Sequence, residues 1–388
     1  MDEPLRVLVV DDTVTYRKIV SDVLGSLPDV QVVGTAPNGK IALQKLELTS
    51  PDLLLLDVEM PEMDGLEVLR RLKSAGSGVG AIMLSAFTAQ GAQTTLAALE
   101  LGAFDFALKP SGNSFQESAE QLRRDLAPKL AAYARRQSVR RVLRGKAAPP
   151  SPAIHHQKQA ETELVGLAAL VPPCSYSHSA PSANSTRSTL FSQPDVVAIG
   201  ISTGGPKALT EMLPRFSSNF PVPILIVQHM PPVFTKSLAD DLNTRCKVRV
   251  FEASDGQQAL PGVALIAPGG KQMRVYRDAD RVHIRITDDP PENSCKPSVD
   301  YLFRSVATVY GARSVGVIMT GMGNDGSAGC RLIHQSGGAI VAQDEASCVV
   351  FGMPREPIEQ GVADVVASLD RIALEITRLV EKGTRACR

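Results

Sequence analysis

Three polar residues that could together perform acyl transfer lie far apart in this 388-residue chain. Ser202, His229 and Asp325 each follow a short apolar run rich in β-branched residues, which is typical of a buried strand. In an open parallel sheet, the loops after the strands meet at one edge. A serine, a histidine and an aspartate that meet there form a nucleophilic triad: the imidazole takes the hydroxyl proton and the carboxylate orients the imidazole.

Each of these residues also has a simpler interpretation. Ser202 lies in a glycine-rich loop before a helix, and such a loop can bind phosphate as well as present a nucleophile. The GxxxxGK[ST] sequence of phosphate loops is absent here. His229 could be a structural histidine at a strand end, and Asp325 or its neighbour Asn324 could cap the next helix. Their common position at one sheet edge favours the triad. An unshifted His229 would lose activity through protonation near pH 6.5.

A second set of polar residues follows strands in the first 110 residues. Asp11 and Asp12 come after the first strand, Asp57 after the third, Ser85 ends the fourth and Lys109 ends the fifth. Three neighbouring carboxylates repel one another, and a hard divalent cation such as Mg²⁺ relieves that repulsion. The hydroxyl and the ammonium could bind a phosphoryl group on Asp57, because carboxylates can form aspartyl phosphates.

Strands and helices must alternate in both halves of the chain to position these residues. In the first half, apolar runs predict strands at 5–10, 30–34, 53–56, 81–84 and 104–108. In the second half we expect strands at 195–201, 222–228, 263–267, 314–319 and 339–343, with a hairpin near 272–287. Helices are expected there at 206–216, 232–244, 298–310, 326–336 and 369–382. This alternation predicts two α/β domains, each with a doubly wound parallel sheet.

The segment between the two patterns differs in composition. Residues 114–143 have a helical pattern that becomes basic, which a solvated helix explains better than a nucleic-acid or membrane patch. Residues 145–193 are rich in Pro, Ser, Ala and His and predict a flexible linker. We therefore expect one domain at 1–130, a helical extension with the linker at 131–192, and a second domain at 193–388.

Charge and cysteine content exclude several protein classes. The 41 basic and 41 acidic residues balance, and no recognition helix follows residue 193, so we expect no nucleic-acid partner. No apolar run approaches the roughly 20 residues that span a bilayer, so no direct membrane insertion is expected. We also see no signal peptide at the N-terminus. The six cysteines are scattered and show no metal-ligand spacing, so we expect reduced thiols in a cytoplasmic protein. We expect no cofactor at the Ser202 site.

The first 110 residues resemble the response-regulator receiver domain, which has a flavodoxin-like fold. The segments that carry this resemblance are Val9–Asp12, Leu56–Pro61, Met63–Gly65, Leu84–Ala86 and Lys109–Pro110. The resemblance implies that Asp57 is phosphorylated and that Mg²⁺ binds at Asp11, Asp12 and Asp57. Ser85 and Lys109 would then sense the phosphoryl group. Phe106 occupies the position of a switch aromatic, although a plain core phenylalanine explains it equally well.

The second half resembles the chemotaxis protein-glutamate methylesterases, the CheB family, with a Rossmann-like fold. The resembling segments are Ile199–Gly205, Gln228–Met230 and Thr320–Gly326, together with Pro268–Gly270 and Val350–Arg355. The resemblance implies that Ser202 is the nucleophile, His229 the base and acid, and Asp325 the orienting carboxylate. It also implies that the Met322 N–H stabilises the oxyanion, with Thr203 beside the nucleophile.

The implied substrate is a γ-glutamyl methyl ester on the cytoplasmic helices of a chemoreceptor, and the family also deamidates receptor glutamines. The phosphodonor would be the histidine kinase of the chemotaxis system. Phosphorylation would raise activity by shifting the receiver away from the Ser202 crevice. The linker is longer than is usual in the family, and a long tether fixes no orientation. The competing hypothesis is a receiver-controlled scaffold whose glycine-rich loop holds an anion.

Overall fold

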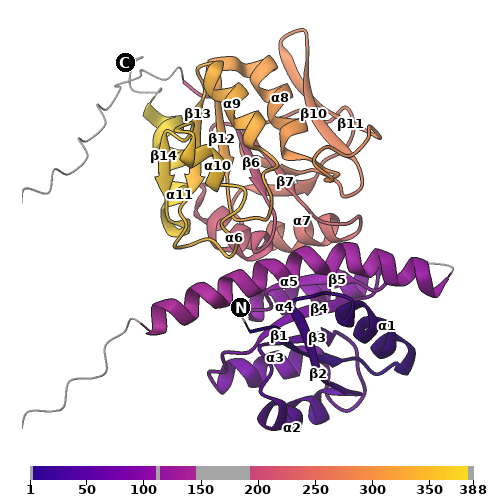
Figure 1. Ribbon diagram of the computed structural model, residues 1–388. Helices are drawn as coiled ribbons and strands as arrows, with labels where there is room; N and C mark the ends of the chain where they lie inside the picture. Colours follow the sequence, from indigo (N-terminus) through magenta and orange to yellow (C-terminus); the bar gives the residue numbers. More distant parts are fainter. Residues whose placement is uncertain (1–2, 111–113, 146–192, 383–388) are drawn as a thin grey trace, which may run out of the picture. The chain divides into compact units, whose positions relative to one another are not determined.

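The structure is a computed structural model, and it describes residues 3–110, 114–145 and 193–382 (Figure 1). The described residues up to 137 and those from 193 onward form one compact unit. The linker expected within 145–193 lies almost entirely outside the described residues.

A five-stranded parallel sheet with the order β2-β1-β3-β4-β5 organises the first domain. Its strands are β1 (Leu5–Val10), β2 (Val30–Ala36), β3 (Leu53–Asp57), β4 (Gly80–Ser85) and β5 (Asp105–Leu108). The helices between and after them are α1 (Val14–Gly25), α2 (Gly39–Thr49), α3 (Gly65–Ser74), α4 (Ala89–Leu101) and α5 (Phe115–Gly145).

Successive residues of these strands are buried on opposite faces of the sheet. On β3, Leu53 and Leu55 belong to the cluster that includes residues of α1 and α5. Leu54 and Leu56 belong to the cluster that includes residues of α2, α3 and α4. Because both faces are covered, the strands appear in the sequence as continuous apolar runs rather than as alternating ones.

A seven-stranded parallel sheet organises the second domain, with the order β14-β13-β12-β6-β7-β9-β8. Its strands are β6 (Val196–Ile201), β7 (Ile224–Gln228), β8 (Arg249–Glu252), β9 (Val263–Ile266), β12 (Ser314–Ile318), β13 (Ala339–Gln343) and β14 (Val365–Ala367). The strands β10 (Gln272–Asp278) and β11 (Arg281–Thr287) form the expected hairpin separately from this sheet.

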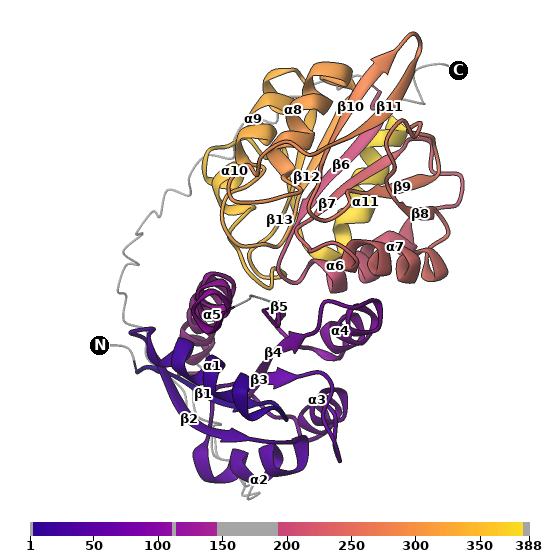
Figure 2. The same ribbon diagram turned by 90° about the vertical axis from the view of Figure 1, so that its right-hand side faces the viewer.

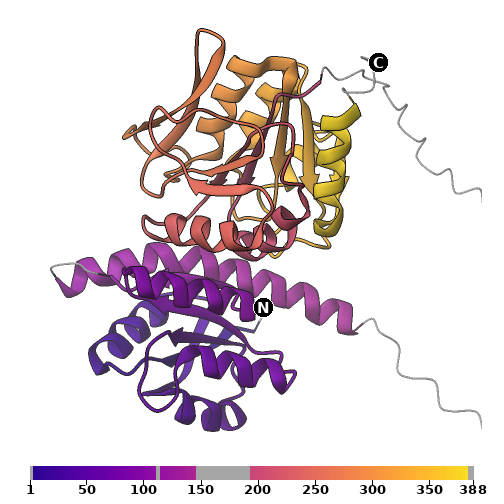
Figure 3. The same ribbon diagram turned by 180° about the vertical axis from the view of Figure 1, so that it is seen from behind.

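Helices again cover both faces of the sheet. They are α6 (Gly205–Met212), α7 (Phe234–Arg245), α8 (Val299–Tyr310), α9 (Ser327–Gln335), α10 (Arg355–Glu359) and α11 (Leu369–Lys382), with short 3₁₀ turns at 213–215 and 311–313. Figure 2 shows α8 and α9 together with the β10–β11 hairpin, whose side chains share one cluster with α8. Helix α11, yellow in Figure 3, packs against β13 and α6.

The structure confirms the predicted fold class of two parallel-sheet α/β domains and adds three short elements. Strands β8 and β14 lie at the two edges of the larger sheet, and α10 has only five residues. Edge strands of three or four residues are half exposed and lack the apolar run that marks a central strand. Among the described residues, no helix has both the length and the apolar character that a membrane crossing requires.

Candidate active site

The loops that carry Ser202, His229 and Asp325 follow three neighbouring strands of the larger sheet. Strand β6 lies between β12 and β7, and all three run parallel. The Ser202 N–H donates to the Thr320 carbonyl at 2.9 Å, and the His229 N–H donates to the Ile201 carbonyl at 3.2 Å. The three loops are therefore joined by backbone hydrogen bonds at one edge of the sheet, as the strand-end argument predicts.

A short hydrogen bond joins His229 to Asp325. Nε2 of His229 lies 2.8 Å from Oδ2 of Asp325, and the side chains are 14% and 3% exposed. The carboxylate also lies at the start of α8. There it accepts the Val299 N–H at 2.7 Å, the Asp300 N–H at 3.2 Å and the Ser298 hydroxyl at 2.8 Å. Helix N-termini stabilise negative charge, so Asp325 is held as an anion facing the imidazole.

The structure excludes the helix-capping interpretation of Asp325 and Asn324. Helix α9 begins after Gly326, which provides no side-chain cap. The Asn324 amide instead donates to Glu356 at 3.4 Å. The carboxylate of Asp325 receives the first N–H groups of α8, a different helix whose position the local sequence does not reveal.

A tight turn before α8 adds two residues that the sequence reasoning missed. Asn293 and Ser294 have φ of +50° and +62°, and Glu292 and Cys295 exchange backbone hydrogen bonds around them. These are the features of a type I′ hairpin turn. Nδ2 of Asn293 donates to Asp325 at 2.9 Å and to Asp300 at 2.8 Å. The Cys295 sulfur lies 3.7 Å from Nδ1 of His229.

Burial and hydrogen bonding move the pKa values of this pair in opposite directions. Burial alone would lower the pKa of His229, but the hydrogen bonds and charges of Asp325 and Cys295 outweigh it and raise the pKa to about 9. Burial alone would raise the pKa of Asp325, but hydrogen bonds from His229, Asn293 and Val299 lower it to about 2. Protonation of His229 is therefore expected to reduce activity at a higher pH than the 6.5 of an unshifted histidine.

The predicted nucleophile and the predicted oxyanion donor have no hydrogen-bond partner among the described residues. Neither the Ser202 hydroxyl nor the Met322 N–H forms a hydrogen bond to any residue that the structure describes. A catalytic serine–histidine hydrogen bond often tightens only when substrate binds. Gly321 lies against Ser202, and a Cβ there would come within 2.8 Å of Ser202 Cβ and 2.2 Å of Met353 Sδ.

Thr203, next to Ser202, forms a hydrogen bond to a residue of the first domain. Its hydroxyl donates to Asp105 Oδ2 at 2.8 Å, and its carbonyl accepts the Thr320 hydroxyl at 2.9 Å. Burial raises the pKa of Asp105. The charge of Lys129 and the hydrogen bonds that Asp105 accepts lower this pKa by a smaller amount. The next residue, Phe106, stacks on Phe234 of α7 at 4.7 Å.

The five residues predicted for phosphoryl chemistry lie at the ends of four neighbouring strands: Asp57 and Ser85 end β3 and β4, and Asp11, Asp12 and Lys109 directly follow β1 and β5. The carboxylate oxygens of Asp11, Asp12 and Asp57 lie within 4.8 Å of one another. Lys109 Nζ lies 2.7 Å from Asp57 Oδ2 and 2.8 Å from Asp11 Oδ2. Burial raises the pKa of Asp57 to about 6, although Lys109 works to lower it. The Ser85 hydroxyl accepts a hydrogen bond from the Thr95 hydroxyl and donates one to the Gly91 carbonyl, both in α4. It forms no hydrogen bond to Asp57.

Comparison with known proteins identifies both domains. Residues 197–376 match the family model for the CheB methylesterase, and residues 7–118 match the model for the response regulator receiver domain. A protein-glutamate methylesterase/protein-glutamine glutaminase of Desulfotalea psychrophila is 47% identical over 97% of this chain and 99% of its own. The chain belongs to the CheB family. A CheB relative of the same name from Trichodesmium erythraeum is 42% identical over 97% of this chain and 99% of its own.

A solved CheB structure matches the catalytic half. The CheB methylesterase catalytic domain of Thermotoga maritima is 40% identical, covers 48% of this chain and 99% of that chain, and has a TM-score of 0.48.

Proposed function

We propose that this chain is a phosphorylation-controlled protein-glutamate methylesterase and protein-glutamine glutaminase that acts on chemoreceptors in the cytoplasm. The relatives' names and the two family models support this activity. The observation that best supports the chemistry is the 2.8 Å hydrogen bond between His229 and Asp325, at the sheet edge where Ser202 follows β6. A phosphate loop would not need this pair, because an anion is held by N–H groups and cations.

We propose a role for each side chain that is consistent with this geometry. Asp325 occupies Nε2 of His229, so Nδ1 is the ring nitrogen left to accept the Ser202 proton. The Ser202 oxygen attacks the γ-carbonyl carbon of the methylated glutamate, and the Met322 N–H donates to the developing oxyanion. As the ester C–O bond breaks, His229 gives this proton to the leaving methoxy oxygen, which departs as methanol; with a glutamine substrate the C–N bond breaks and the amide nitrogen departs as ammonia. Water, activated by the same histidine, then releases glutamate from the acyl-enzyme.

The acidic cluster of the first domain fits a phosphoacceptor. We propose that Asp57 takes the phosphoryl group from the histidine kinase of the chemotaxis system. The donor set at Asp11, Asp12 and Asp57 consists of oxygens only, which suits Mg²⁺. When bound, this ion would neutralise phosphoryl charge. Lys109, which now pairs with Asp57, would pair with a phosphoryl oxygen instead.

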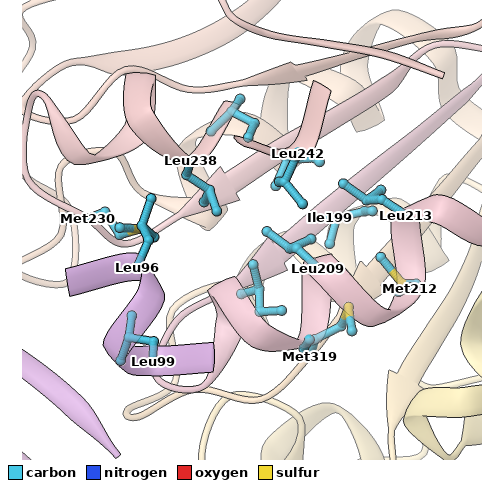
Figure 4. Close-up of a cluster of buried hydrophobic side chains, with 14 of the residues drawn as sticks. Leu96, Leu99, Ile199, Leu209, Met212, Leu213, Met230, Leu238, Leu242 and Met319 are labelled. Carbon is cyan, nitrogen blue, oxygen red and sulfur yellow. The ribbon is translucent and has the colours of Figure 1, made fainter. Parts of the chain in front are cut away.

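Contacts of β5 and α4 support control of the catalytic loop by the receiver. Asp105 bonds to Thr203, and Phe106 stacks on Phe234. Leu96 and Leu99 of α4 share one hydrophobic cluster with side chains of the catalytic domain (Figure 4). We propose that Asp57 phosphorylation weakens these contacts and thereby raises esterase activity.

Methanol release from a methylated receptor tests the proposed function. The Ser202→Ala variant should keep the thermal transition of the wild type and lose methanol release, whereas the wild type should be labelled on Ser202 by a fluorophosphonate. Methanol release that survives in the alanine variant would refute Ser202 as the nucleophile. Absence of the label together with absence of esterase activity would favour an anion-binding scaffold.

A further inference from the structure

A mixed cluster of donor atoms surrounds the base of the proposed triad. Ligand atoms of His229, Cys295 and Asp325 all lie within 4.8 Å of one another. Cysteine spacing along the chain gives no sign of this cluster, because Cys295 comes from the turn before α8 and His229 from the end of β7. Imidazole nitrogen and thiolate sulfur are typical ligands of Zn²⁺, whereas Mg²⁺ prefers oxygen ligands.

The hairpin turn fixes the thiol in place. Glu292 and Cys295 exchange backbone hydrogen bonds of 3.1 and 2.7 Å, and the Asn293 amide joins the turn to Asp325. The thiol is half-buried, and its contacts are the Asn293 carbonyl at 3.4 Å and Nδ1 of His229 at 3.7 Å; a thiol is a weak hydrogen-bond donor. A bound cation would therefore replace only weak hydrogen bonds of the thiol.

The spacing of the two donors matches a tetrahedral ion. Zinc bonds of about 2.3 Å to sulfur and about 2.0–2.1 Å to nitrogen place two tetrahedral ligands roughly 3.6 Å apart. Cys295 Sγ and His229 Nδ1 are separated by 3.7 Å. On the other side of the ring, Asp325 accepts the Nε2 hydrogen bond, which is the carboxylate–histidine–zinc arrangement that orients a metal-binding imidazole.

We propose that Cys295 and His229 form an inhibitory Zn²⁺ site, with Cys295 Sγ and His229 Nδ1 as the ligands and Asp325 as the residue that orients the ring. When Zn²⁺ binds, the Cys295 thiol releases its proton to solvent and its sulfur bonds to the ion, with no transfer of electrons. The ion then occupies the nitrogen that must accept the Ser202 proton. Ester hydrolysis stops until the ion is removed. The inhibition rests on the proposed function, but the binding of the metal does not.

The experiment compares the full-length wild type with Cys295→Ser and with Cys246→Ser, a control half-buried thiol at the end of α7. All other cysteines stay in place in both variants. Excess Mg²⁺ is kept in every sample, since the oxygen-only site at Asp57 suits that ion. Methanol release is measured against buffered free Zn²⁺, and chelator is then added. In parallel, Co²⁺ is added as a spectroscopic probe, because a thiolate ligand gives it a near-ultraviolet charge-transfer band.

We expect Zn²⁺ to inhibit the wild type and Cys246→Ser at the same free concentration, with recovery on chelation. Cys295→Ser should need at least about tenfold more Zn²⁺ and should lack the thiolate–cobalt band. Equal Zn²⁺ sensitivity of Cys295→Ser, or a cobalt band that survives in it, would overturn the proposal. A cobalt band that depends on Cys295 without inhibition would overturn the inhibitory role. If the wild type releases no methanol even without Zn²⁺, the proposed function fails, and the cobalt band still tests the metal site.

Discussion

Asp325 binds the imidazole of His229 at 2.8 Å with the same carboxylate that accepts the first N–H groups of α8. The start of α8 therefore contributes to the site, although its residues lie outside the loops that carry Ser202, His229 and Asp325. The anion is stabilised by the helix terminus, and the anion in turn stabilises a protonated imidazole. The free enzyme is consequently expected to hold His229 as an imidazolium at neutral pH.

The first prediction concerns the pH dependence of ester hydrolysis. His229 must be neutral to accept the Ser202 proton, and its pKa is raised from 6.5 to about 9. The active fraction is therefore small below the raised pKa and grows as pH rises through it. kcat/KM for methanol release, corrected for spontaneous hydrolysis, should keep increasing between pH 7 and about 9. A plateau already complete at pH 7 would contradict the raised pKa.

Cys295 provides the internal control for that pH profile. Its hydrogen bond and charge help to raise the pKa of His229. Cys295→Ala should therefore move the rise in kcat/KM to lower pH, whereas Cys246→Ala should leave the profile unchanged.

The second prediction assigns Asn293 a positioning role. Its amide bridges Asp325 and Asp300, at 2.9 and 2.8 Å, and so separates two buried carboxylates. Asn293→Gly removes the amide while allowing the positive φ of the turn. Losing a hydrogen bond to a charged group costs about 1.5 kcal/mol or more, so kcat should fall about tenfold with little change in KM.

Ser294→Gly is the matched control, because Ser294 occupies the same turn with φ of +62° and contributes no side-chain bond to Asp325. It should retain the kcat of the wild type. Equal losses in both variants would indicate a general effect on the turn rather than positioning of Asp325.

The third prediction concerns regulation. Asp105 accepts a hydrogen bond from the hydroxyl of Thr203, the residue after Ser202, at 2.8 Å. Removing this bond with Asp105→Ala should weaken the inhibited state by about 1 kcal/mol and raise activity without phosphodonor roughly fivefold. Asp57→Asn should instead keep the low basal activity and abolish the response to acetyl phosphate with Mg²⁺. An Asp105→Ala variant with a lower Tm but unchanged basal activity would show that the bond is only structural.

Sequence reasoning worked best where burial is strongest. Continuous apolar runs such as Leu53–Leu56 are buried on both faces, and they mark the central strands of both sheets. The edge strands β8 and β14 were missed because half-exposed segments of three or four residues lack that signal.

The same distinction applies to the candidate site. Ser202 and His229 directly follow central strands, so their shared edge was predictable, although their catalytic roles stay predictions. Asn293, Ser298 and Cys295 were not found, because they lie between the β10–β11 hairpin and α8. Only the packing of α8 brings that segment to Asp325. Consecutive Asn293 and Ser294 could have indicated a turn, but not the neighbour it contacts.

The last prediction tests the close packing of Gly321 against Ser202. A Cβ on Gly321 would lie 2.8 Å from Ser202 Cβ and 2.2 Å from Met353 Sδ, and Met353 is fully buried. Gly321→Ala must therefore displace Ser202 or its support, and a displacement of about 1 Å costs on the order of 100-fold in rate. Gly323→Ala in the same loop is strained by the φ of +80° at that position, but its Cβ would have no atom within 4 Å. We expect Gly321→Ala to lose most methanol release and fluorophosphonate labelling, and Gly323→Ala to retain both. If Gly323→Ala lost as much activity as Gly321→Ala, loop strain rather than contact with Ser202 would explain the loss.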